Sequence, residues 1–166
     1  MDKYSFQQTA KHWNDWACES VKLIKDFLAD NMTEDEPRFR SYYILLSYAF
    51  ELMLKSRLVA VTKISEHELI KVYGHDVNKI LQKLKDLNEL EKIGIKVLPQ
   101  EVKSYIYKIE TTDGKLFFIH DFTNIRYYPK NYKDSWDTAN TILETANVML
   151  NISNKIRTLR IPRMNL

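Results

Sequence analysis

Two short segments contain residues that could move a proton or hold a phosphate. The first is Gly74-His75-Asp76, which lies between two stretches of helical periodicity. A histidine at a helix start can act as an acid, a base or a phosphate contact, and a neighbouring carboxylate can orient it. Gly74 and Asp76 also fit a simpler role, because glycine ends helices and aspartate caps them. Both interpretations of this turn remain open.

The second segment is HDFTNIRYYPK, residues 120–130. Arg126 stands next to Tyr127 and Tyr128, and arginine with a stacking aromatic ring is a combination that holds phosphates and bases. An arginine beside Tyr-Tyr-Pro can equally fix a loop against a helical bundle. The segment therefore supports either a ligand contact or a packing role.

A third set of polar residues lies in the most apolar part of the chain, about residues 37–62. This stretch is apolar on several faces, which predicts a central, surrounded helix. Ser47, Glu51 and Lys55 follow one another at four-residue steps and form a single polar track. Glu51 before Lys55 is the favourable order for an ion pair on a helix. The track predicts either an ion pair at the edge of the core or the lining of a cleft or dimer interface.

The elements that must position these residues are mostly helices. Apolar residues at three- and four-residue steps, together with caps, predict helices at about 6–30, 37–62, 66–74, 76–90, 99–113 and 133–159. A capping box, Ser65 to Glu68, starts the third of them. Residues 115–132 show no helical period and are rich in aromatic side chains. We therefore predict an all-α, up-and-down bundle of five or six helices with an irregular aromatic loop near 115–132, in one domain spanning 1–166.

Composition limits the classes of protein that this chain can be. Only 3 Gly and 4 Pro in 166 residues favour long helices, and one cysteine, Cys18, predicts a reducing, cytoplasmic compartment. The chain opens without an apolar signal segment, and no run approaches the ~20 apolar residues that cross a bilayer, so we expect no membrane partner.

The net charge of the chain is less informative than the distribution of its charged residues along the sequence. The net charge of +3 does not by itself indicate nucleic acid. The last 16 residues contain no acid and four basic side chains, at Lys155, Arg157, Arg160 and Arg163. These side chains fit either a phosphate-binding tail or the usual preference of cations for a helix C-terminus.

Familiar cofactor and metal motifs are absent from the sequence. It has no glycine-rich phosphate loop, no paired cysteines at metal-ligand spacing and no HExxH. No two of the four histidines share ligand spacing on one helix. We therefore expect neither a metal nor a cofactor.

Three segments in order resemble the HEPN superfamily (higher eukaryote and prokaryote nucleotide-binding). They are RSYYILLSYAFELMLKSRL, then YGHDVNKIL, then IRYYP, and the resemblance covers roughly residues 38 to 150. It implies an all-α bundle, often a homodimer, in bacterial toxin–antitoxin or phage-defence systems. Some members pair with a nucleotidyltransferase protein, and others are metal-independent ribonucleases.

The chain departs from the ribonuclease branch at one point. That branch has an arginine followed four to six residues later by a histidine, and no histidine follows Arg126. Arg57 has its nearest downstream histidine ten positions on, at His67. The resemblance therefore indicates a HEPN-like protein without nuclease activity. It also implies that its polar residues approach one another: Glu51, Lys55, His75, Asp76, Arg126 and Tyr127.

Three hypotheses for function remain. The first is a binding or regulatory module for a nucleotide, RNA or a nucleotidyltransferase partner, with ligand contacts from Glu51, Lys55, His75, Arg126, Tyr127 and Tyr128. The second is a metal-independent endoribonuclease with a rearranged site, whose catalytic candidates are His75 as acid or base, Asp76 orienting it and Arg126 stabilising the transition state. The third is a structural domain that only contacts a protein partner.

Overall fold

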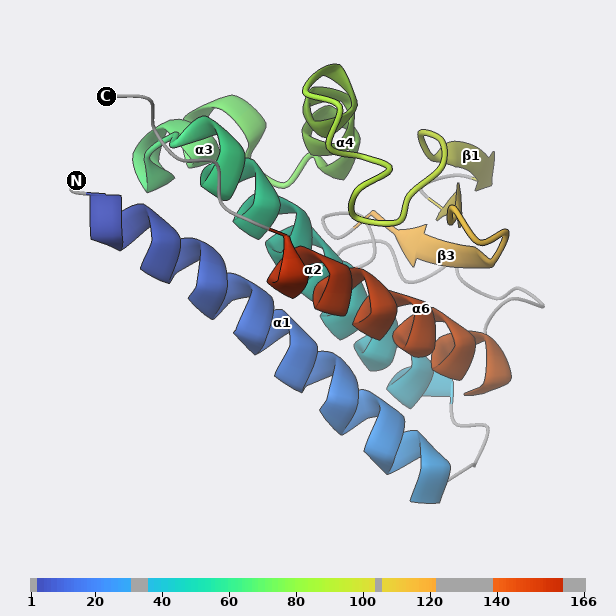
Figure 1. Cartoon of the computed structure of the whole chain (residues 1–166). Coiled ribbons are helices and arrows are strands. Elements are labelled where there is room, and N and C mark those ends of the chain that lie inside the picture. Colours follow the sequence, from blue (N-terminus) through green and yellow to red (C-terminus); the bar gives the residue numbers. More distant parts are fainter. Residues whose placement is uncertain (1–2, 31–35, 104–105, 122–138, 160–166) are drawn as a thin grey trace.

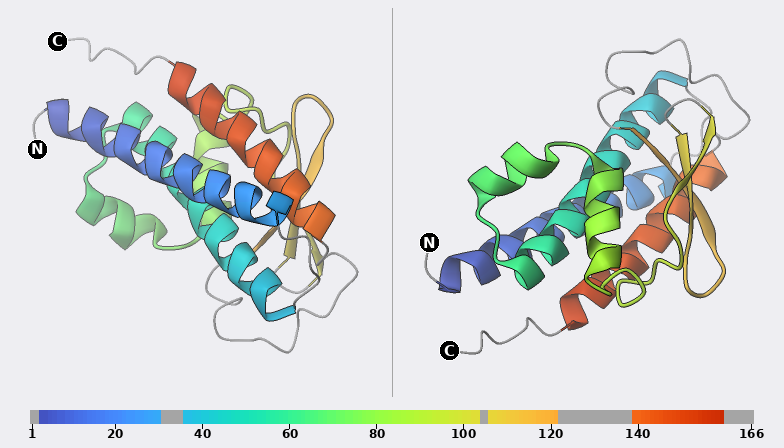
Figure 2. Two further views of the ribbon diagram at one scale, coloured as in Figure 1. Left: turned by 90° about the horizontal axis from the view of Figure 1, so that it is seen from below. Right: turned by 90° about the horizontal axis from the view of Figure 1, so that it is seen from above.

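Three long helices form the body of the molecule (Figure 1). The computed structural model describes residues 3–30, 36–103, 106–121 and 139–159. Helices α1 (Lys3–Asp30), α2 (Glu36–Thr62) and α6 (Ala139–Thr158) lie side by side in every view (Figures 1 and 2). This arrangement confirms the predicted helices at 6–30 and 37–62, and it confirms the described part of the last one.

Helix α2 is central, as its apolar faces predict. It packs against α1, α6, α4 and strand β3. Its inward side chains are completely buried and include Tyr43, Leu46, Phe50, Met53 and Leu54. A helix surrounded in this way has little exposed surface, so a polar side chain on it must find partners within the protein.

Two short helices follow α2, and the second of them, α4, crosses it (Figure 2, right). Helix α3 (Glu66–Tyr73) begins with the predicted capping box, in which the Ser65 hydroxyl accepts from the Glu68 N–H and the Glu68 carboxylate accepts from the Ser65 N–H. These hydrogen bonds lower the pKa of Glu68. Helix α4 (Val77–Asp86) follows after one tight turn and packs on α2.

Helix α4 is shorter than the predicted 76–90. It ends at Asp86, and Asn88 then adopts a positive φ of 57°. The apolar residues Leu87 and Leu90 continue the pattern beyond the helix because they still pack on the core, although the backbone has turned. The spacing of apolar residues therefore predicted which residues are buried, but it did not predict where the helix ends.

The all-α prediction is wrong, because residues 100–103, 106–110 and 116–120 form a three-stranded antiparallel sheet. Its strands are β1 (Gln100–Lys103), β2 (Ile106–Glu110) and β3 (Leu116–His120), in the order β1-β2-β3. Strands β2 and β3 form a hairpin in which Ile106 is opposite His120 and Glu110 is opposite Leu116. The predicted helix at 99–113 does not form, and the predicted irregular loop begins as a strand.

Side-chain chemistry explains why the strands form. Ile106 and Ile109 are three residues apart, which fits a helix, but the segment is rich in β-branched and aromatic residues that favour a pleated strand. The Asp113-Gly114 pair supplies the turn, with Gly114 at a φ of +83°. Phe117 and Ile119 then alternate inward and pack on the helices, as the edge-to-face contact of Phe117 with Phe50 shows.

His120 ends β3 in the core, where it is 2% exposed. Its ring lies against Tyr43 of α2, with the ring centroids 4.2 Å apart. Burial disfavours the charged imidazolium and lowers the pKa of His120 from its ordinary value of 6.5 to about 4. The folded protein therefore holds this ring neutral at pH values where the unfolded chain protonates it.

Acid should destabilise the fold through His120. Because its folded pKa is depressed, its contribution to stability is complete above about pH 6.5 and is lost as the pH falls toward 4. The unfolding free energy of the wild type should fall between pH 7.5 and 4.5. In His120→Phe this fall should be smaller by about 2 kcal/mol, as measured by urea unfolding at both pH values.

The exposed His67 provides the control. His67→Phe should keep the wild-type pH dependence. An unchanged dependence in His120→Phe would show that the buried ring does not cause it.

Candidate functional site

The polar track on α2 meets the turn between α3 and α4. Glu51 Oε1 receives the Lys55 ammonium at 2.6 Å, which confirms the predicted i,i+4 ion pair. The same carboxylate also contacts His75, whose Nδ1 lies 3.0 Å from Oε1 and 3.1 Å from Oε2. The structure thus brings three of the predicted site residues, Glu51, Lys55 and His75, into one cluster.

The three members of this cluster differ sharply in exposure. The Glu51 side chain is 1% exposed and that of Lys55 is 9% exposed, whereas the His75 side chain is 49% exposed. The cluster therefore runs from the core to the surface, with the carboxylate at its inner end. Its outer end is an imidazole that a ligand in solution can reach.

The Glu51 contact determines which tautomer the neutral His75 ring adopts. A carboxylate can only accept hydrogen bonds, so Nδ1 carries the proton, and Nε2 is the basic nitrogen when the ring is neutral. A second proton makes an imidazolium whose charge faces the Glu51 carboxylate. The arrangement can therefore present either a base or a cation at the protein surface.

Asp76 has a different role from the one that the second hypothesis gives it. Its Oδ1 accepts from the Lys79 N–H at 3.0 Å and caps α4, which confirms the capping prediction. Gly74 ends α3 at a φ of +52°, and its N–H donates to the Ile70 carbonyl. The carboxylate seen to hold the His75 ring is Glu51, which lies 24 residues away in sequence.

The two sequence segments meet beside this turn. A pocket of about 20 Å³, room for one water-sized group, is lined by residues of the α4 start and of the sheet: Asp76, Asn78, Tyr107, His120 and Asp121. Asp76 lies next to His75, and His120 and Asp121 open the segment that leads to Arg126. The described start of that segment, His120 and Asp121, therefore lies beside the turn.

Tyr107 and Asn78 are members of this pocket that sequence reasoning missed. Burial, followed by the negative charges of Glu101 and Asp121, raises the pKa of Tyr107, while a hydrogen bond with Asn78 opposes the rise. The missed signal was the strand itself. Once Tyr107 is assigned to β2, its alternation with Ile106 places it on the other face of the strand.

The remaining predicted site residues cannot be placed. Arg126, Tyr127 and Tyr128 lie outside the described residues. Their approach to His75 stays a prediction, and so does the distinction between a ligand contact and loop packing.

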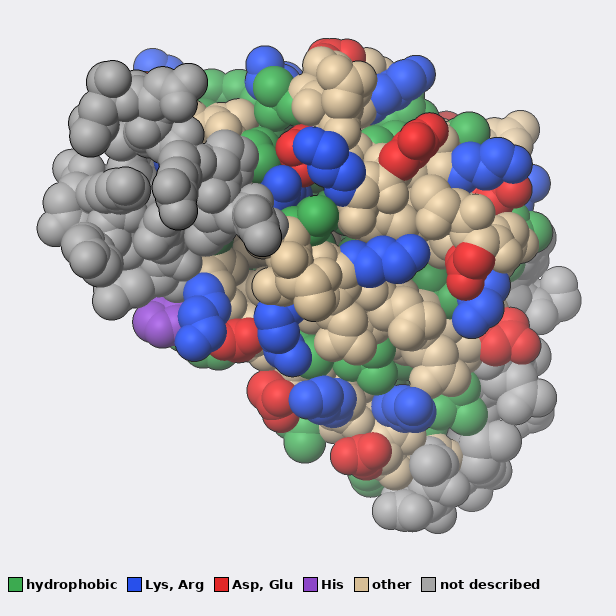
Figure 3. Space-filling view, in the orientation of Figure 1, with side chains coloured by type: hydrophobic (Ala, Val, Ile, Leu, Met, Phe, Trp, Pro, Cys, Tyr) green, Lys and Arg blue, Asp and Glu red, His purple; other side chains and the backbone are tan. Residues whose placement is uncertain are grey.

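Other features of the described residues narrow the chemistry. Within them no group of three or more His, Cys, Asp or Glu side chains is placed to hold a metal ion, and no helix has the length and apolar character needed to cross a membrane. On the face that Figure 3 shows, basic and acidic side chains are interspersed over α1 and α6. That face does not present a single-sign field of the kind that attracts a polyanion.

Comparison with known proteins adds no family assignment. No protein-family model, curated protein or solved structure matches the chain. The resemblance to HEPN proteins therefore rests on the sequence segments alone.

The Glu51–Lys55 pair should be strongly coupled. Glu51→Met leaves the Lys55 charge buried without its carboxylate, and we expect a loss of about 3 kcal/mol in the unfolding free energy. Adding Lys55→Met removes the stranded charge, so the double variant should be more stable than Glu51→Met alone. Urea unfolding of the wild type, of the two single variants Glu51→Met and Lys55→Met, and of the double variant gives the coupling energy.

An exposed pair on α1 provides a matched control. Glu19 and Lys22 lie 3.1 Å apart with side chains 67% and 48% exposed. Glu19→Met should change stability by less than about 0.5 kcal/mol. Equal effects of the two Glu→Met changes would contradict the buried-pair interpretation.

Proposed function

We propose that the chain is a HEPN-like module that binds nucleotide or RNA phosphate at the His75 surface and has no nuclease activity. The proposal includes a homodimer, a nucleotidyltransferase partner protein, a cytoplasmic location and a role in bacterial toxin–antitoxin or phage-defence systems. Its basis is the order of three sequence segments together with the cluster that joins two of them.

One observation carries the proposal: the Glu51 carboxylate holds both Lys55 and His75 and is itself buried. Bonds to the carboxylate fix the orientation of the imidazole, which reduces the entropy lost when a ligand binds. A phosphate would contact His75 at Nε2, the ring nitrogen that does not face Glu51. Arg126 would add a second cation, and Tyr127 or Tyr128 a stacking surface.

The homodimer is supported by exposed apolar residues on α1. Trp16 and Leu23 are both largely exposed and, seven residues apart, lie on one side of the helix. Exposed apolar side chains gathered on one face are typical of protein contacts. A second copy or a partner protein would cover them.

Binding of a single-stranded RNA oligonucleotide tests the proposal. Affinity should fall as salt rises, and His75→Ala and Arg126→Ala should each weaken binding by about three- to tenfold. Fluorescence anisotropy between 50 and about 200 mM salt measures both effects. Sedimentation velocity on the same samples reports whether the chain is a dimer.

His67→Ala is the matched control, because His67 is an exposed histidine on α3 outside the cluster. It should bind as the wild type does. Salt-independent binding, or equal binding by His75→Ala and His67→Ala, would contradict the assigned surface. A purely monomeric chain would remove the dimer from the proposal.

The second candidate function is a metal-independent endoribonuclease, and the Glu51–His75 contact favours it. A carboxylate that orients a solvent-accessible histidine is the arrangement that general acid–base catalysis uses. In this reading His75 Nε2 exchanges a proton with the 2′-hydroxyl or the leaving oxygen, and Glu51 takes the orienting role first assigned to Asp76.

A cleavage assay in EDTA distinguishes this candidate from the first. If it is correct, the purified chain cuts structured or unstructured RNA, His75→Ala abolishes cleavage and Glu51→Gln lowers it by about 10²-fold or more. His67→Ala should cut normally. A pure chain that cuts neither substrate, or a His75→Ala variant that still cuts, excludes the ribonuclease.

A further inference from the structure

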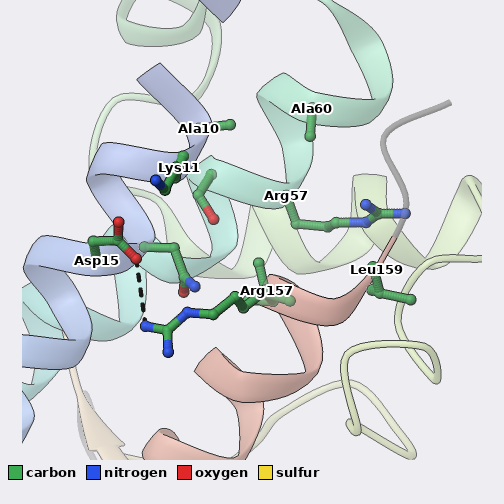
Figure 4. Close-up of a pocket in the computed structure, with 10 residues that line it drawn as sticks. Ala10, Lys11, Asp15, Arg57, Ala60, Arg157 and Leu159 are labelled. Atoms are coloured by element: carbon green, nitrogen blue, oxygen red, sulfur yellow. Dashed lines mark hydrogen bonds and ion pairs between the residues drawn. The ribbon is translucent and has the colours of Figure 1, made fainter. Parts of the chain in front are cut away.

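A larger pocket, of about 350 Å³, lies among α1, α2 and the C-terminal end of α6 (Figure 4). Helix α1 contributes Ala10 and Lys11, α2 contributes Arg57 and Ala60, and α6 contributes Arg157. The volume is within the range of sites for small organic ligands. The proposed function does not use this pocket.

Hydrogen bonds between α1 and α6 hold one wall of the pocket in place. Asn14, which lines it, donates from Nδ2 to the Ser153 carbonyl at 3.1 Å, and the Ser153 hydroxyl donates to Asn14 Oδ1 at 3.1 Å. Both side chains are buried. This reciprocal pair fixes the separation of the two helices, so the pocket exists before any ligand arrives.

The lining of the pocket has more positive than negative charge. Three cationic side chains, Lys11, Arg57 and Arg157, line it with a single carboxylate, Asp15. Arg157 Nη2 lies 3.4 Å from Asp15 Oδ1, which is the ion pair marked in Figure 4. Arg57 is paired with Glu89, so the preference of the pocket for an anionic ligand comes mainly from Lys11.

Arg57 is the most firmly held of these cations. It is 3% exposed, and its Nε and Nη2 both lie 2.7 Å from Glu89 Oε2. Lys92 binds the other oxygen of Glu89 at 2.9 Å, so two cations share one carboxylate. These contacts hold Arg57 in place at the wall of the pocket.

The rest of the lining is aliphatic and small. Ala10 and Ala60 are buried, and they leave space that a larger side chain would fill. Ile156 and Leu159 add branched aliphatic surface, and no aromatic ring is among the described residues that line the pocket. Without a ring there is nothing to stack on a nucleobase, so the pocket suits an aliphatic body better than a nucleotide.

We propose that this pocket binds a small aliphatic carboxylic acid. The carboxylate is held by Lys11 of α1 and Arg157 of α6, and the alkyl chain packs against the two alanines and against Ile156 and Leu159. Binding would tie the end of α6 to α1 and α2. The site is separate from the His75 surface, so its test does not depend on the proposed function.

Octanoate is a suitable probe, with octanamide as the neutral analogue of equal size. Isothermal titration of the full chain should show saturable binding of octanoate with a Kd of about 0.1 to 1 mM. Octanamide should bind about tenfold more weakly or not at all. Adenosine monophosphate and inorganic phosphate, which lack an alkyl chain, should bind more weakly than octanoate.

Two variants of one helix give a matched pair. Lys11→Gln removes a cation of the pocket, and Lys22→Gln removes an exposed cation of α1 that does not line it. Lys11→Gln should weaken octanoate binding about fivefold, and Lys22→Gln by less than about twofold. Ala60→Leu should fill the pocket and reduce binding by tenfold or more, as judged on protein with wild-type circular dichroism.

Each result decides the proposal. Absence of saturable octanoate binding up to about 10 mM, or equal binding of octanoate and octanamide, overturns it. If adenosine monophosphate binds more tightly than octanoate, the ligand is a nucleotide rather than an aliphatic acid, and the proposal is overturned. If Ala60→Leu does not fold, the lysine pair decides: equal effects at Lys11 and Lys22 contradict this pocket, and a selective effect at Lys11 supports it.

Discussion

The buried carboxylate of Glu51 is the constraint on which the arrangement around α2 depends. A charge that is 1% exposed in the middle of an apolar helix is stable only if partners satisfy it. Lys55 supplies one partner from the same helix, and His75 supplies the other from the turn between α3 and α4. That second contact places the turn over α2, so the position of α3 and α4 and the orientation of the exposed imidazole have a common cause.

Local signals in the sequence predicted this region well. The capping box at Ser65, the end of α3 at Gly74 and the cap at Asp76 each depend on hydrogen bonds within a few residues. The Glu51–Lys55 pair likewise needs only one turn of helix. The contact between Glu51 and His75 could not be predicted in the same way, because the two residues are 24 positions apart and the contact depends on the path of the chain between them.

The sheet shows where periodicity fails. Ile106 and Ile109 are three residues apart. In a helix this spacing would place both side chains on one buried face, but in β2 it occurs because the strand is buried at both positions, which lie on its opposite faces. The hairpin is decided by pairing with β3, a partner that local patterns do not reveal. Because Tyr107 and His120 enter the pocket beside Asp76 through these strands, the error in fold class also hid half of that pocket.

The same geometry bears on the choice between binding and cleavage. General acid–base cleavage of RNA moves protons at two oxygens, and it works best with two groups that titrate near neutral pH. Near the turn, His75 is exposed, whereas His120 is enclosed and burial lowers its pKa to about 4, so it stays neutral and out of reach of solvent. The pKa of Tyr107 is raised, so its phenol stays protonated near neutral pH and cannot accept a proton. Among the described residues near the turn, this surface therefore exposes one imidazole, that of His75, which supports the proposal of phosphate binding over that of cleavage.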